Sequence, residues 1–135
     1  MSLNESKRQE LILYRVEQAK EAIKDVELLL ANERLQPAMN RIYYGMFYML
    51  LALGLKYHFE TSKHAQLIGW FNKTFMKDET LSRKYGQILR DAFRNRMNSD
   101  YEAYVTLTRD EVAAQFEQMK EFIAAIEQYI LSQGC

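Results

Sequence analysis

Side chains that could bind phosphate gather in one short segment of the chain, residues 94–101. The segment consists of Arg94, Asn95, Arg96, Met97, Asn98, Ser99, Asp100 and Tyr101. An arginine guanidinium has planar donors that engage phosphate oxygens two at a time, so Arg94 and Arg96 are candidate phosphate ligands. Asn95 and Ser99 lie beside them and belong to the same predicted ligand set. The sequence therefore predicts that a functional site lies in the 94–101 segment.

A structural role is the alternative for the same arginines. Arg96 would face the apolar side of its helix if that helix continues, and an unpaired charge there is costly. We therefore expect Arg96 to pair with Asp100 or Asp91, and such a pair could be purely structural. Arg94 falls on the opposite side of the helix, as a solvated surface residue would.

Two residues outside this segment could contribute to a site. Arg41 lies in the most hydrophobic stretch of the chain, so it is either a phosphate ligand or a side chain packed along apolar neighbours. His64 is the residue that could supply imidazole chemistry, although a lone histidine in the first turn of a helix is typically a packed or capping residue.

Several classes of site find no support in the sequence. Paired Glu-x-x-His motifs, Cys-x-x-Cys pairs, glycine-rich phosphate loops and His-Glu-x-x-His are absent, so we predict neither a metal nor a cofactor. The lone cysteine, Cys135, cannot form an internal disulfide. Eighteen basic residues balance eighteen acidic ones, so binding to nucleic acid would need a local patch. No signal peptide or membrane-spanning run is recognised, and we expect a cytoplasmic protein that does not bind membranes.

Amphipathic helices are expected to position these residues. Apolar residues recur at spacings of three and four in residues 12–30 and again in residues 112–130, which predicts two long packed helices. Ser6 with Gln9 forms a capping-box pattern before the first of these helices, Asn32 marks its end, and Thr108 with Glu111 precedes the last.

The middle of the chain predicts three more helices. Residues 39–53 are apolar almost all round, so this helix should be central and its aromatic residues should belong to the core. A short helix follows the predicted caps Thr61 and Ser62, and another runs from Leu81 to about Arg96. We therefore predict one all-α domain, residues 1–135, folded as an up-and-down bundle of four main helices plus a short one.

Three stretches of the chain resemble the HEPN domains (higher eukaryotes and prokaryotes nucleotide-binding). Residues 40–47, which read Asn-Arg-Ile-Tyr-Tyr-Gly-Met-Phe, are similar to the second helix of a prokaryotic HEPN subgroup called UPF0332. Residues 62–64, Ser-Lys-His, also match that subgroup. The subgroup ends in an Arg…Asp-Tyr pattern, and this chain has a similar ending in Arg94, Asp100 and Tyr101.

The resemblance implies an activity and a set of partners. HEPN ribonucleases are homodimers that cleave RNA without metal, by attack of a 2′-hydroxyl on its own phosphate. Many are toxins encoded beside a small nucleotidyltransferase, which acts as antitoxin by attaching adenylate to the motif tyrosine. On this resemblance Arg94 would bind phosphate, Tyr101 would be the modification site, and the partners would be a second copy, the nucleotidyltransferase and RNA or nucleotide.

One departure from the ribonuclease motif limits that comparison. Ser99 stands where those enzymes carry histidine, and a hydroxyl cannot exchange protons near neutral pH as an imidazole does. Losing a general acid or base typically costs about 100-fold to 10,000-fold in rate. A Ser99 protein could still bind phosphate through its arginines.

Three functions therefore remain open. The first is a HEPN-domain protein that binds RNA or nucleotide, or serves as a toxin–antitoxin component with a nucleotidyltransferase. The second is an active metal-independent ribonuclease in which Arg94 works with a displaced base such as His64. The third is a helical interaction module without a site.

Overall fold

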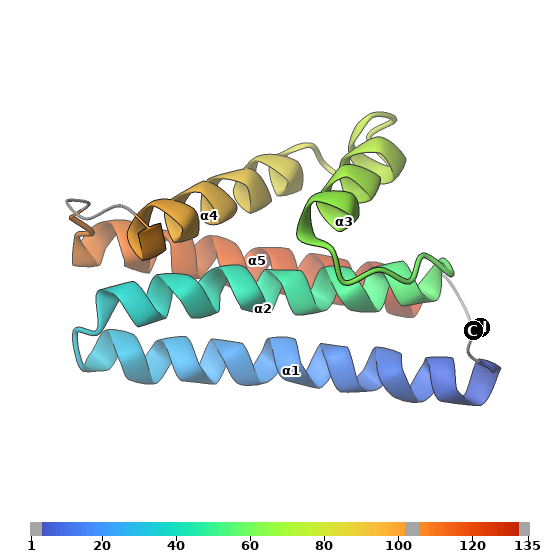
Figure 1. The fold of residues 1–135 in the computed structure, drawn as a ribbon, viewed down its shortest axis with the longest axis horizontal. Helices are drawn as coiled ribbons and strands as arrows, with labels where there is room; N and C mark the ends of the chain where they lie inside the picture. The colour runs from blue at the N-terminus through green and yellow to red at the C-terminus, as the bar shows by residue number, and fades with distance from the viewer. Residues whose placement is uncertain (1–3, 102–105, 133–135) are drawn as a thin grey trace.

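The computed structural model describes residues 4–101 and 106–132, which form helices joined by short connections (Figure 1). The elements are α1 (Glu5–Ala31), α2 (Leu35–Lys56), α3 (His64–Phe71), the π-helical turn η1 (Asn72–Met76), α4 (Lys84–Tyr101) and α5 (Arg109–Ser132). Within these described ranges there is no strand. The prediction of an all-α bundle with four main helices and a short one is confirmed.

Helix α2 is the centre of the bundle. It packs against α1, α3, α4 and α5, and Figure 1 shows α1 and α5 running beside it while α4 crosses at an incline. Its buried face includes Ile42, Met46 and Leu53. A side chain at Gly45 would collide with Met119 of α5 and bring its Cβ within 3.0 Å of Ala22 on α1, so the missing side chain allows the three helices to approach closely.

The apolar stripes predicted for the first and last helices face this core. In α1 the stripe is buried except at half-buried Ile23, and in α5 it is buried throughout. None of the described helices is both long and apolar enough to cross a membrane.

Two predicted helix caps differ in the structure, and α4 begins at Lys84 instead of the predicted Leu81. Asn4, not Ser6, caps α1, because its Oδ1 accepts a hydrogen bond from the backbone N–H of Lys7 at 2.9 Å. Helix α3 begins after Lys63 without a side-chain cap, since Thr61 instead accepts from the backbone N–H of Lys63 at 3.2 Å. Thr108 does cap α5, accepting from the backbone N–H of Glu111 at 3.1 Å.

Helix α4 continues past the point where its apolar periodicity fades. It remains helical through Tyr101, so the entire 94–101 segment forms its last turns. Helical spacing then places Ala92, Arg96 and Ser99 on the buried side. Cys135, a lone thiol in the sequence, lies outside the described residues.

Candidate functional site

Arg96 is buried among aromatic rings, as its place on the helix predicted. Its Cζ lies 5.1 Å from the ring centre of Tyr43, 5.3 Å from that of Tyr44 and 6.0 Å from that of Phe93. Its Nη1 is 3.6 Å from a carboxylate oxygen of Asp100, so the predicted ion pair forms. The charge is therefore balanced by one carboxylate and three ring faces.

Polar contacts fix the last turn of α4 to the start of α2. Asn40 donates to Asp100 at 3.2 Å, and Gln36 donates to the backbone carbonyl of Ser99 at 2.6 Å. The Ser99 hydroxyl is buried and donates to the carbonyl of Arg96 at 3.2 Å. The residue that replaces the motif histidine is thus engaged with its own helix.

Arg94 lies on the other side of α4. Its side chain is 60% exposed, and its Nη2 lies 2.8 Å from a carboxylate oxygen of Asp91. Asp91, the other partner predicted for Arg96, therefore pairs with Arg94 instead. Asn95 is half-buried, whereas Tyr101 is 72% exposed. The structure therefore separates the two arginines of the 94–101 segment, and only Arg96 joins the aromatic cluster.

His64, from α3, completes the cluster around Arg96. Its Nδ1 lies 2.7 Å from the hydroxyl of Tyr43, and its ring stacks on Phe47 with the centroids 4.0 Å apart. It also meets the ring of Tyr44 edge-on at 5.7 Å. Tyr43 of α2 thus contacts both Arg96 of α4 and His64 of α3, residues that are far apart in the sequence.

Burial controls the protonation of this group. The pKa of His64 is lowered, first because burial disfavours the imidazolium and second because Arg96 is positively charged. The pKa of Tyr43 is raised, because the desolvation of its phenolate outweighs the attraction of Arg96. At neutral pH both side chains are therefore uncharged, and Arg96 carries the local charge.

A stripe of half-buried residues on α2 leads outward from this cluster. We call it the outer stripe of α2; its members are Pro37, Arg41, Tyr44, Tyr48 and Leu51. Arg41 lies over two of its rings, with Cζ 5.4 Å from the centre of Tyr44 and 5.8 Å from that of Tyr48. Its Nη2 donates to the Tyr48 hydroxyl at 3.0 Å. Tyr44 thus contacts Arg41, Arg96 and His64 together.

Surface hollows border the outer stripe along its length. One of about 610 Å³ lies at the start of α2 and is lined by Arg34, Gln36, Asn40 and Arg41 among others. Another lies between α1 and α2, where Arg41 and Tyr48 face acidic residues of α1.

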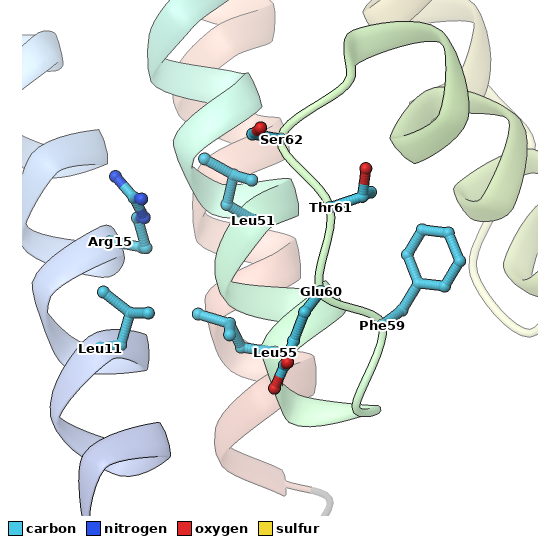
Figure 2. Close-up of a pocket in the computed structure, with 8 residues that line it drawn as sticks. All are labelled: Leu11, Arg15, Leu51, Leu55, Phe59, Glu60, Thr61 and Ser62. Atoms are coloured by element: carbon cyan, nitrogen blue, oxygen red, sulfur yellow. The ribbon is translucent and has the colours of Figure 1, made fainter. Parts of the chain in front are cut away.

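A third hollow, of about 320 Å³, is drawn in Figure 2. There Leu11 and Arg15 of α1 face Leu51 and Leu55 of α2, and the extended segment that carries Ser62 closes the side. The linings of the three hollows include Pro37, Arg41, Tyr48 and Leu51 of the outer stripe, and they change from charged at the start of α2 to mostly apolar near Leu51.

Sequence reasoning missed part of this arrangement. All aromatic residues of the predicted helix 39–53 were expected in the core. This prediction is correct for Tyr43 and Phe47, which are buried, but wrong for Tyr44 and Tyr48, which are half-buried. The spacing of Arg41, Tyr44 and Tyr48 by three and four residues was the available signal, because it places a cation and two rings on one face. In residues 4–101 and 106–132 no group of histidine, cysteine or acidic side chains is arranged to hold a metal ion.

Comparison with known proteins gives a consistent family. The sequence model of the family described as "HEPN domain" matches residues 12–129 of this chain. A UPF0332 protein of Thermotoga maritima is 34% identical over 125 residues, which cover 93% of this chain and 95% of the relative. Two Methanocaldococcus jannaschii proteins, named "Putative toxin MJ0142" and "Putative toxin MJ0605", are 27% and 30% identical. These matches cover 88% and 73% of this chain, and 81% and 73% of the respective relatives. Since the family model and the Thermotoga relative each match most of its length, the chain belongs to the HEPN domain family.

Proposed function

We propose that this HEPN-domain protein binds single-stranded RNA along the outer stripe of α2 and acts as the toxin component of a toxin–antitoxin pair. The observation that carries the proposal is the meeting of Arg41, Arg96 and His64 around the ring of Tyr44. On the half-buried face of α2 one cation, Arg41, lies over the rings of Tyr44 and Tyr48. Such a face can bind phosphates and stack bases in turn.

The chemistry of the stripe suits a single strand. Proteins that bind single-stranded nucleic acid combine basic side chains with aromatic rings, and each stacked base contributes about 1–3 kcal/mol. Arg41 can engage a phosphate through its guanidinium edge while its face stays on the tyrosines. Arg34 and Gln36, in the hollow at the start of α2, would extend the contact along the strand.

The toxin role rests on the family and on one exposed residue. Two relatives carry the word toxin in their names, and the HEPN resemblance pairs such proteins with a small nucleotidyltransferase. In this proposal the protein forms a homodimer, and the nucleotidyltransferase attaches adenylate to Tyr101. The 72% exposure of Tyr101 would allow that enzyme to reach its hydroxyl.

We propose binding without cleavage as the principal activity. The Ser99 hydroxyl donates to a backbone carbonyl, so it offers a substrate no acid or base. His64 provides the one specific ground for a second candidate, a metal-independent ribonuclease, because its imidazole lies in the same cluster as Arg96. The two candidates differ in whether bound RNA is cut.

The test is binding and cleavage of a labelled single-stranded RNA of mixed sequence, measured in EDTA. We expect the wild-type protein to bind intact RNA and Arg41→Ala to weaken binding about tenfold, which corresponds to roughly 1.4 kcal/mol. Arg90→Ala is the matched control, because Arg90 is an exposed arginine of α4 that bonds Gln87 at 2.9 Å. Equal losses for the two variants would reject the outer stripe, and cutting that His64→Ala abolishes would establish the ribonuclease.

A further inference from the structure

The hydroxyl of Tyr43 has a single proton, and its environment decides where that proton points. His64 Nδ1 lies 2.7 Å away and can accept a hydrogen bond when it is unprotonated. Arg96 and Tyr44 also act on this phenol, but the guanidinium of Arg96 has donors and no acceptor, and the structure gives no hydrogen bond between the hydroxyls of Tyr43 and Tyr44 among the described residues. Arg96 can therefore donate to the phenol oxygen but cannot receive its proton.

The opposite arrangement would leave a buried donor without a partner. If His64 carried its proton on Nδ1 and donated to Tyr43, the phenolic proton would have to find another acceptor. Among the described residues, Nδ1 of His64 is the acceptor for which the structure gives a hydrogen bond to this hydroxyl. A buried donor left unsatisfied costs free energy, and Tyr43 is fully buried.

We infer that Tyr43 holds His64 as the neutral tautomer with its proton on Nε2, so that the imidazole presents an N–H donor to RNA bound along the outer stripe. This inference rests on the proposed RNA binding only for the identity of the acceptor, a phosphate or base oxygen. Tyr43 is then a positioning residue that acts through His64. The guanidinium of Arg96 lies over the ring of Tyr43, with Cζ 5.1 Å from its centre, and Tyr43 in turn donates to His64.

The surroundings of His64 keep it in this state. From α2 it meets Tyr43, Tyr44 and Phe47, and from α4 the charge that acts on it is that of Arg96. Adding a proton to Nδ1 would break the hydrogen bond from Tyr43 and place a second cation near Arg96. His64 therefore contributes one neutral hydrogen bond to a ligand, and Nε2 has no lone pair with which to act as a base.

The first experiment reads the tautomer directly in the RNA-free protein. Long-range proton–nitrogen NMR of the full chain near neutral pH should show the pattern of a protonated Nε2 for His64, with the signal assigned by its loss in His64→Gln. Tyr43→Phe removes only the hydroxyl and should shift the ring toward a mixture of tautomers. A wild-type pattern with the proton on Nδ1, or one that Tyr43→Phe leaves unchanged, overturns the inference.

The second experiment asks what the ligand requires of residue 64. The side-chain amide of glutamine can place an N–H near the position of Nε2, whereas alanine cannot. We expect His64→Gln to bind the labelled RNA within about twofold of wild type and His64→Ala to bind up to about tenfold more weakly, as the loss of one hydrogen bond predicts. Equal weakening by the two substitutions would contradict the donor role.

The two experiments separate this inference from the proposed function. A wild-type protein that binds no RNA while NMR shows the Nε2 proton rejects the function and keeps the tautomer. A wild-type protein that binds RNA while NMR shows the proton on Nδ1 keeps the proposed function and rejects the tautomer. Circular dichroism of each variant checks that the helices remain folded, and Tyr43→Phe, which preserves the buried ring, keeps the tautomer test independent of the RNA-binding variants.

Discussion

Arg94 and Arg96 are separated by one residue, yet their environments are opposite. Arg96 is buried beneath Tyr43 and Tyr44 and paired with Asp100, while Arg94 is exposed and paired only along its own helix. The family resemblance had pointed to Arg94 as the functional arginine. At the residue scale, the direction of a side chain on α4 therefore decides its role, and Arg96 is the residue that joins the histidine.

The two arginines should differ sharply in their effect on stability. Arg96→Ala removes the stem from the aromatic cluster and leaves Asp100 with Asn40 as its remaining donor, so we expect a loss of about 2–4 kcal/mol in the free energy of unfolding. Arg94→Ala should change it by less than about 0.5 kcal/mol, because exposed ion pairs contribute little. Urea unfolding of both variants measures the difference, and similar losses would show that Arg96 is not structurally buried in solution.

His64 should make stability depend on pH. Its pKa is lowered in the folded protein, so below its ordinary value of 6.5 the unfolded chain binds the proton more readily than the folded chain does. The stabilisation is complete above 6.5 and is lost as the pH falls from there toward the folded pKa. We expect His64→Gln to flatten the fall in unfolding free energy between neutral and mildly acidic pH.

The second histidine provides a matched control for that measurement. His58 is exposed in the connection after α2 and has a φ of 63°. Its ring lies outside the Tyr43 cluster, so His58→Gln removes a histidine and leaves the surroundings of His64 intact. A flattening of equal size in the two variants would mean that His64 has no special environment.

At the scale of the elements, helical periodicity predicted most of the fold. The stripes of α1 and α5 and the central place of α2 follow from spacing alone, since burial of an apolar face is what a helix of this pattern requires. The end of α4 was harder, because its last turns carry few apolar residues and periodicity could not show that the helix continues.

The candidate site could be predicted only in part. Burial of Arg96 and its pairing with Asp100 followed from helical phase, but its meeting with His64 did not. That contact depends on how the α2–α3 connection places α3 against Phe47 and Tyr43, and one sequence contains no pattern that fixes the path of such a connection. The surface position of Tyr44 and Tyr48 depends likewise on which face of α2 the neighbouring helices leave uncovered.

The α2–α3 connection is itself fixed by a close contact at Gly54. A Cβ at this position would lie 2.7 Å from the backbone carbonyl oxygen of Phe59, so the connection would have to move. We expect Gly54→Ala to destabilise the protein by about 1–3 kcal/mol, as overpacking in a core does. RNA binding should weaken as well, because the same connection places His64.

Gly69 is the control for this substitution. It is exposed in α3 and a Cβ there would meet nothing within 4 Å, so alanine should raise helix propensity without a clash. Gly69→Ala is expected to stabilise the protein by roughly 0.5–1 kcal/mol. Thermal unfolding of the pair tests the argument, and stabilisation by both substitutions would show that the connection is free to adjust at Gly54.

At the scale of the whole molecule, the charge distribution restricts where RNA can bind. The formal net charge is zero, so no general positive field attracts a polyanion. The hollow between α1 and α2 sets Glu17, Glu21 and Asp25 opposite Arg41. Phosphates would be repelled on that side of Arg41, so we expect the strand to lie on its other side, toward Tyr44 and the N–H of His64.

Salt dependence of RNA binding would measure this local character. Each phosphate neutralised on a single strand contributes about −0.7 to the slope of log affinity against log salt concentration. With Arg41 and Arg34 as the accessible cations and His64 neutral, we expect a slope between about −0.7 and −1.4. Arg41→Ala should reduce its magnitude by about 0.7, and Arg90→Ala should leave it unchanged. His64→Gln should also leave the slope unchanged, because a neutral donor releases no counterion.

A slope that responds to Arg90 and not to Arg41 would instead place the strand on the exposed arginines of α4, and the outer stripe of α2 would then be available to a protein partner.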